Sequence, residues 1–260
     1  MAFVPEHIFR EYDIRGIADT ELTDEFVMSV GYAFGTWLLA RGVRKATLGG
    51  DVRLSTTRIK AAAAAGMMKA GISVTDIGFV STPTFYWSMY HLGADGGLMV
   101  TGSHNPKEFN GLKVAYDKAT LWGDDIREIM RIIKEDRMVT ADDPGSLRFA
   151  GINEEYLDML VSKIKLGPRK PKIVCDSGNG TAGIYAPEFL RRIGCDVAEL
   201  YSEPDGTFPN HHPDPTKREN LPKLIETVLA EGADLGVGFD GDSDRIGVVD
   251  DRGEIIWGDR

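Results

Sequence analysis

A short polar loop, Thr101-Gly102-Ser103-His104-Asn105-Pro106, carries the first group in this sequence that could do chemistry. It lies between two apolar runs, Gly96 to Thr101 and Gly111 to Tyr116, that are typical of strands. Glycine and Asn-Pro favour a tight turn with an unusual backbone, so the sequence predicts that the hydroxyl of Ser103 faces outward on a fixed loop. We interpret Ser103 as a candidate phosphoryl carrier. The alternative is a serine that serves only the turn.

Three carboxylates follow an apolar strand in the second half of the chain, in the segment Leu235 to Arg245. Asp240, Asp242 and Asp244 alternate with small residues, and oxygen ligands so close together repel one another unless a divalent cation lies between them. Mg²⁺ is the cation that we expect. An EF-hand would require glycine in place of Arg245 and helices on either side, which excludes it. A solvated acidic turn remains the alternative.

Two basic side chains occupy positions that strand patterns favour. The segment Phe9 to Gly16 alternates apolar and charged residues and closes on glycine, which predicts that Arg15 lies at the end of a strand, facing a cleft. An ordinary solvated arginine is the alternative. In the strand that leaves the serine loop, alternation places Lys113 on the face opposite Leu112 and Val114. A charged amine is therefore expected close to the loop in sequence.

Strands and helices alternate along the whole chain. Apolar periodicity predicts helices over Thr23 to Leu39, Thr56 to Ala70, Thr82 to His91, Asp124 to Lys134, Asn153 to Ile164, Ala182 to Ile193 and Leu221 to Glu231. Thr23 and Ser55 are the expected caps of the first two. This alternation indicates two consecutive α/β domains, each a mostly parallel mixed sheet covered by helices on both faces. The stretch Arg137 to Ala150 lacks periodicity, so the expected domains are residues 1–150 and 151–260.

Composition limits the kinds of partner. The chain has 260 residues, of which 42% are hydrophobic, and a net charge of -10, so we expect neither nucleic acid nor a membrane as partner. No spanning or signal segment is evident, which favours a cytoplasmic protein. Cys175 and Cys195 lie in apolar runs and are expected to be reduced core residues. Joint metal ligation by His211 and His212 is disfavoured, because adjacent strand residues point apart.

Four segments, in order along the chain, are similar to the signatures of a known family. They are Phe9 to Gly16, Thr101 to Pro106, Phe208 to Pro215 and Asp240 to Arg245. On these segments the chain resembles the α-D-phosphohexomutases, in particular the bacterial phosphomannomutase/phosphoglucomutase group. The Thr-Gly pair before the serine favours the glucose and mannose enzymes over the phosphoglucosamine mutases. Ser243 stands where Gly or Ala is commoner in the family, and we expect this change to be tolerated.

The resemblance implies a role for individual residues. Ser103 would carry a phosphate, and Asp240, Asp242 and Asp244 would hold Mg²⁺ together with an oxygen of that phosphate. The basic groups implied around the transferred phosphoryl group and the substrate are Arg15, His104, Lys113 and Arg245. Charge supports this, since a phosphoserine adds roughly -1.5 to -2 charges to a site that already holds three carboxylates. Lys113 is the first candidate for general base or acid, and the histidine is the second.

The resemblance also implies a reaction. The phosphoserine gives its phosphoryl group to a hexose 1-phosphate or 6-phosphate, a 1,6-bisphosphate forms and turns around, and the serine takes back the other phosphate. The implied activity is that of an isomerase for mannose and glucose phosphates, with Mg²⁺ as cofactor and glucose 1,6-bisphosphate as activator. Hexose phosphates are the expected partners, and the expected state is a monomer or weak dimer.

Family members have about four domains, and domains III and IV are expected to be absent from this chain, so little turnover is expected from it alone. Two other functions stay open. The first is a Mg²⁺-dependent phosphatase of the haloacid-dehalogenase type, with Asp240 or Asp242 as the nucleophile. The second is a non-catalytic module that binds metal or phosphate.

Overall fold

The computed structural model describes residues 4–258, which form two compact units. The first unit comprises the chain up to Phe79 together with Thr84–Gly151. The second comprises the chain from Ile152 onward together with Val80–Pro83, a short stretch from the first half of the sequence. Asp259 and Arg260, the end of the sequence, lie outside the described residues.

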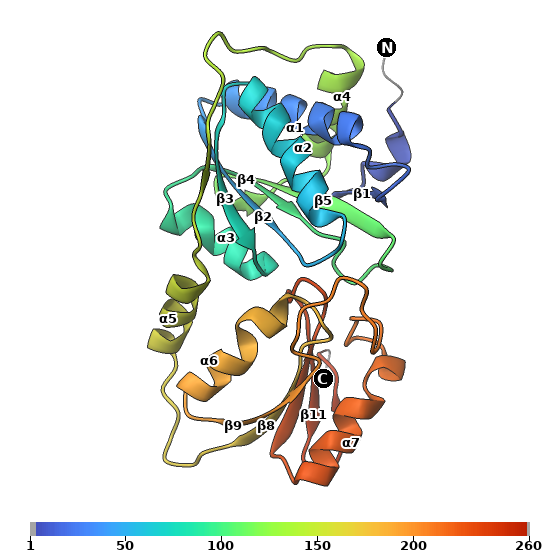
Figure 1. Cartoon of the computed structure of the whole chain (residues 1–260), viewed down its shortest axis with the longest axis vertical. Coiled ribbons are helices and arrows are strands. Elements are labelled where there is room, and N and C mark those ends of the chain that lie inside the picture. The colour runs from blue at the N-terminus through green and yellow to red at the C-terminus, as the bar shows by residue number, and fades with distance from the viewer. Residues whose placement is uncertain (1–3, 259–260) are drawn as a thin grey trace. The chain divides into compact units, whose positions relative to one another are not determined.

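The first unit is built on one mixed sheet of seven strands (Figure 1). The strands are β1 (Ile14–Ile17), β2 (Lys45–Gly50), β3 (Ser73–Phe79), β4 (Gly96–Val100), β5 (Phe109–Tyr116), β6 (Ala119–Thr120) and β7 (Leu147–Phe149). Their order is β1-β5-β4-β2-β3-β7, with β6 paired to β5. Strands β2, β3, β4 and β7 are parallel, whereas β5 is antiparallel to β4 and β1. The strands β4 and β5 thus form a hairpin, and the loop that joins them holds Ser103.

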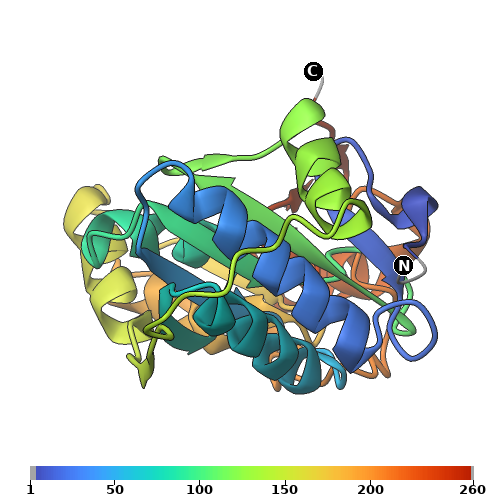
Figure 2. The same cartoon turned by 90° about the horizontal axis from the view of Figure 1, so that it is seen from above.

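Helices cover both faces of this sheet. Helices α1 (Asp24–Leu39), α2 (Thr56–Lys69) and α4 (Asp124–Lys134) share one apolar core with the strands. On this face α1 and α2 run side by side (Figure 2). On the other face, α3 (Thr82–His91) brings Phe85 and Met89 against Gly97 of β4. Thr23 caps α1 as predicted, because its side chain accepts a hydrogen bond from the Phe26 N–H at 3.3 Å.

The second unit is built on a sheet of five strands in the order β12-β11-β10-β8-β9. These are β8 (Lys172–Asp176), β9 (Asp196–Leu200), β10 (Leu235–Phe239), β11 (Ile246–Asp250) and β12 (Ile255–Ile256). Strands β8, β9 and β10 are parallel, and β11 is antiparallel to β10 and β12. Because Gly238 pairs with Asp176, β8 and β10 end at the same edge of the sheet.

The strand β8 shows why helices cover both faces of this sheet. Ile173 and Cys175 pack in one core with α6 (Ala186–Arg192), while Val174 packs in another with α7 (Pro222–Glu231). This is the alternation that a strand buried on both faces requires. Figure 1 shows α6 and α7 on opposite sides of the sheet. The unit also contains α5 (Asn153–Lys163) and the 3₁₀ turns η2 (Thr181–Ile184) and η3 (Arg218–Asn220), while η1 (Glu6–Ile8) belongs to the first unit.

The predicted fold of two consecutive α/β domains, each with a mostly parallel mixed sheet covered on both faces, is confirmed. The cysteine prediction is confirmed as well, because Cys175 and Cys195 are free and buried. Among residues 4–258, no helix combines the length and the apolar character that crossing a membrane requires.

Three local predictions are wrong. The Ser55 side chain does not cap α2, because its hydroxyl accepts a hydrogen bond from Asn110 Nδ2 at 2.9 Å. The helix predicted from Ala182 is interrupted at Tyr185, because Pro187 starts a new helix in its first turn. The strand predicted from Phe9 begins only at Ile14, where pairing with β5 starts. Arg15 therefore lies near the start of β1 and not at its end.

Candidate functional site

The serine loop holds its central residue in an unusual conformation. Ser103 has a φ of 49°, which few residues other than glycine adopt. Its N–H donates to Thr101 Oγ1 at 2.8 Å, and its Oγ lies 3.2 Å from His104 Nδ1. Ser103 is only 2% exposed, so the prediction of an outward-facing hydroxyl is wrong.

Arg53 explains why the loop is drawn inward. Its buried guanidinium donates to four backbone carbonyls, those of Pro106 (2.6 Å), Phe109 (3.0 Å), Ser103 (2.9 Å) and Asn105 (2.6 Å). The Arg53 Nε lies 3.2 Å from Asp51 Oδ2, and the same carboxylate oxygen accepts the N–H of Gly102 at 3.0 Å. A buried cation needs partners of this kind, and the loop carbonyls provide them. The loop is therefore fixed by an ion pair from the turn after β2.

Gly102 is required by close packing. A Cβ at this position would lie 2.4 Å from Arg53 Nε and 2.9 Å from the Phe109 carbonyl. The sequence predicted a glycine that supplies an unusual turn conformation, but Ser103 itself carries the positive φ. Glycine is needed because the arginine approaches the backbone.

The predicted basic residues of the first unit flank the strand that leaves the loop. Arg15 on β1 is paired with Gly111 on β5, and Lys113 lies two residues further along β5, opposite Met99. Arg15 is largely buried and forms an ion pair with Asp13 at 2.5 Å. The structure thus groups Arg15, Lys113 and the serine loop at neighbouring positions in one unit.

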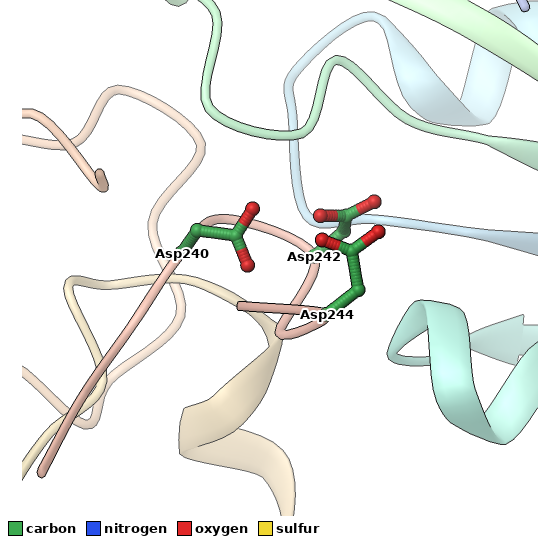
Figure 3. A group of neighbouring side chains, drawn as sticks. All are labelled: Asp240, Asp242 and Asp244. Carbon is green, nitrogen blue, oxygen red and sulfur yellow. The ribbon is translucent and has the colours of Figure 1, made fainter. Parts of the chain in front are cut away.

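The three predicted carboxylate ligands lie together in the second unit. Asp240, Asp242 and Asp244 project from the loop after β10 (Figure 3), and one oxygen of each lies within 4.8 Å of the others. Asp240 and Asp242 are fully buried, whereas Asp244 is exposed. The Arg245 N–H donates to Asp240 Oδ1 at 3.0 Å, and its Nε lies 3.9 Å from Asp244 Oδ1.

The electrostatics of this cluster suit a cation. Burial first, and then the charges of Asp242 and Asp244, raise the pKa of the Asp240 carboxyl to about 8. Ionising Asp240 beside the other two carboxylates is therefore unfavourable without a positive charge between them. Three carboxylates are the hard oxygen ligands that Mg²⁺ prefers, so the residues fit the expected metal.

Buried hydroxyl groups stabilise the same loop through hydrogen bonds. Ser243 has a φ of 60°, and its Oγ lies 2.8 Å from Thr181 Oγ1. The Thr181 N–H donates to the Gly241 carbonyl at 3.1 Å. Burial raises the pKa of the Tyr185 phenol, although hydrogen bonds with Ser81 and Ser243 oppose the shift. The unusual Ser243 is thus part of a buried hydroxyl network.

The motif Phe208 to Pro215 contributes an ion pair. His211 Nε2 lies 3.0 Å from Asp176 Oδ2, and His211 Nδ1 lies 2.9 Å from the carbonyl of His212. Both partners are acceptors, so the protonated imidazole, in which both ring nitrogens donate, satisfies both contacts. Burial lowers the pKa of His211, but the hydrogen bond and charge of Asp176 outweigh it, so the pKa is raised. His211 fixes this segment to the end of β8.

Sequence reasoning missed Asp51 and Arg53. It treated them only as a turn before a helix. The available signal was a pair of opposite charges directly after a strand whose last five residues are all buried. Charged groups that follow such a strand are expected to be buried and paired.

Comparison with known proteins agrees with the four signatures. The family models for α/β/α domains I and II of phosphoglucomutase/phosphomannomutase match residues 6–139 and 154–253. A phosphomannomutase/phosphoglucomutase from Pseudomonas putida is 41% identical over 259 residues, which are 100% of this chain and 55% of that protein. A phosphoglucomutase from Neisseria gonorrhoeae is also 41% identical, over 100% of this chain and 56% of that protein.

A solved structure shows the same architecture. The crystal structure of a phosphoglucomutase/phosphomannomutase family protein from Burkholderia thailandensis superimposes with a TM-score of 0.94 at 38% identity, covering 99% of this chain and 57% of that one. The chain therefore spans about half the length of the relatives that it matches. By its two matched domains, the chain belongs to the phosphoglucomutase/phosphomannomutase family.

Proposed function

We propose that this chain performs the phosphoryl-transfer chemistry of a phosphohexomutase, with Ser103 as a reversible phosphate carrier. The observation that carries the proposal is the aspartate cluster, in which Asp240 and Asp242 are fully buried and Asp244 completes the set. Such a group is unfavourable without a cation. Within this family, a chain that carries both a cation site and a candidate phosphoserine loop is suited to phosphoryl transfer.

Each residue then has a defined task. The aspartates would hold Mg²⁺, which when bound neutralises charge on a phosphate oxygen. Arg15, Lys113 and Arg245 supply positive charge to the phosphoryl group and the substrate, because transfer depends mainly on positioning and electrostatic stabilisation. Lys113 is the proposed general acid or base, and His104, whose Nδ1 is 3.2 Å from the Ser103 hydroxyl, is the second candidate.

The proposed reaction interconverts hexose 1-phosphate and hexose 6-phosphate, with mannose or glucose as the sugar. Phosphate on Ser103 passes to the free hydroxyl of the sugar phosphate, and the phosphate at the other end of the resulting 1,6-bisphosphate returns to the serine. The first unit is the proposed phosphoserine domain, and the second is the proposed metal domain.

The test is a half-reaction, because the chain spans about half the length of its relatives. Incubation with glucose 1,6-bisphosphate and Mg²⁺, followed by peptide mapping with mass spectrometry, is expected to place one acid-stable phosphate on Ser103. Ser103→Ala should remove it, and Asp242→Asn should slow its formation by at least about 100-fold, as loss of an electrostatic contact to the transferred group does. Omission of Mg²⁺ should have the same effect.

The matched control is Ser88→Ala. Ser88 is also buried, but its hydroxyl donates locally to the Phe85 carbonyl at 2.6 Å, so phosphate transfer to Ser103 should be unchanged. An acyl phosphate on Asp240 or Asp242 would instead support the phosphatase alternative. A chain that takes up no phosphate at all would support a non-catalytic module.

A further inference from the structure

A threonine from the first half of the sequence contacts the aspartate cluster. Thr82 belongs to the second unit with the stretch Val80–Pro83, although 160 positions separate it from Asp242. Its Oγ1 donates to Asp242 Oδ2 at 2.7 Å, and its backbone N–H donates to the Asp242 carbonyl at 2.9 Å. Both residues are buried. Thr82 therefore holds the main chain and the side chain of the same aspartate.

These two bonds constrain the carboxylate. The backbone bond fixes the position of the Asp242 Cα, and the hydroxyl bond limits rotation of the side chain about the remaining torsions. An ionised carboxylate accepts at about four lone-pair positions, so a bond from Thr82 to one oxygen leaves capacity for a cation. Hydrogen bonds to metal ligands orient them and tune their affinity.

We infer that Thr82 is a positioning residue for the cation site, and that its hydroxyl holds Asp242 in the orientation that binds a divalent cation. The inference rests on the proposed function and deepens it. It extends the site to a residue that the sequence indicated only as the start of a helix. Thr82 does not ligate the cation, and it acts through Asp242.

The experiment compares hydroxyl-bearing and hydroxyl-free side chains of the same size. Mn²⁺ binding to the full chain is measured by electron paramagnetic resonance, which reports free ion and needs no turnover. Thr82→Val keeps the shape but removes the donor, and it is expected to weaken Mn²⁺ binding by about 10–100-fold. Thr82→Ser keeps the hydroxyl and should bind within about threefold of the original chain. Thr82→Ala provides a smaller hydroxyl-free variant in case valine disturbs the packing.

The matched control is Thr47→Val. Thr47 is a fully buried threonine on β2, in the other unit, so removal of its hydroxyl should leave Mn²⁺ binding unchanged. Thr82→Val and Thr82→Ala binding as tightly as the original chain would overturn the inference while the proposed metal site stands. Failure of Asp242→Asn to weaken Mn²⁺ binding, or no binding by the original chain, would overturn the proposed function and the inference together.

Discussion

Two serines in the candidate site have left-handed backbone conformations that usually favour glycine. Ser103 has a φ of 49° and Ser243 a φ of 60°. The left-handed region costs a residue with a Cβ about 1 kcal/mol or more. In both loops, hydrogen bonds offset this cost, from Arg53 to the Ser103 carbonyl and between Ser243 and Thr181. The strain is therefore found where the loops must present functional groups.

Substitution of Ser243 separates the backbone effect from the hydroxyl effect. Ser243→Ala loses the hydrogen bond to Thr181 but keeps the strained φ, so the free energy of unfolding should fall by about 1–2 kcal/mol. Ser243→Gly loses the same bond but relieves the strain, so it should remain within about 0.5 kcal/mol of the original chain. Urea denaturation of the original chain and the two variants measures their free energies of unfolding. An alanine variant as stable as the serine protein would contradict the expected order.

At the scale of elements, a charged pair helps to fix one irregular segment to the sheet. The motif Phe208 to Pro215 is attached to the end of β8 through His211 and Asp176. Tyr201 also packs its ring edge-on against the His211 ring, with centroids 5.4 Å apart. Asp176 is the last residue of the buried strand β8, so the partner of the histidine is held rigidly.

This pair makes the stability of the second unit depend on pH. Because the pKa of His211 is raised in the folded chain, the stabilisation is fully present below its ordinary pKa of 6.5 and is lost as pH rises through the raised pKa. His211→Gln should lower the free energy of unfolding by about 1.5–3 kcal/mol at pH 6, the range for hydrogen bonds with charged groups. The difference between the two proteins should shrink toward pH 9. His212→Gln, at the exposed neighbour, is the control.

Thermal melting of the three proteins between pH 5.5 and 9 measures this dependence. A stability difference between His211→Gln and the original chain that stays constant over the whole range would show that the pair is not ionic. A pH-dependent loss of stability in His212→Gln would show that His212, and not His211, causes the effect.

At the scale of the whole molecule, the stretch Val80–Pro83 connects the proposed cation site to the first half of the sequence. Binding stabilises whatever conformation holds the ligand, by about 2.7 kcal/mol at a ligand concentration 100 times the dissociation constant. Saturating Mn²⁺ should therefore slow amide hydrogen exchange in residues 240–245 and also at Thr82, whose N–H donates to Asp242. Peptides from α1 should exchange as before.

Hydrogen exchange followed by mass spectrometry tests this on the full chain. Slower exchange in residues 240–245 without any change in residues 80–83 would contradict the proposed coupling of Thr82 to the cation site. In Asp242→Asn, both effects should disappear together.

The features that were predicted correctly depend on residues that are close together in the sequence. Thr23 is correctly placed as a cap because a cap acts within one turn, and the proximity of the three aspartates follows from their spacing within five positions. The partners of Arg53 and Thr82 could not be assigned, because they lie about 50 and 160 positions away. The buried strand before Arg53 signals a buried charge but does not identify the carbonyls that it contacts. The interruption at Tyr185 was missed because apolar periodicity continues past it, although Pro187 marked the break.

The distance in sequence between Thr82 and Asp242 also sets an order of events during biosynthesis. The ribosome adds Asp242, the partner of Thr82, 160 residues after Thr82 itself. Until then, Val80–Pro83 lacks part of the unit to which it belongs, since that unit begins again only at Ile152. The proposed cation site is therefore completed only after the aspartate loop has been synthesised, and a cation bound there would report that the second unit has folded.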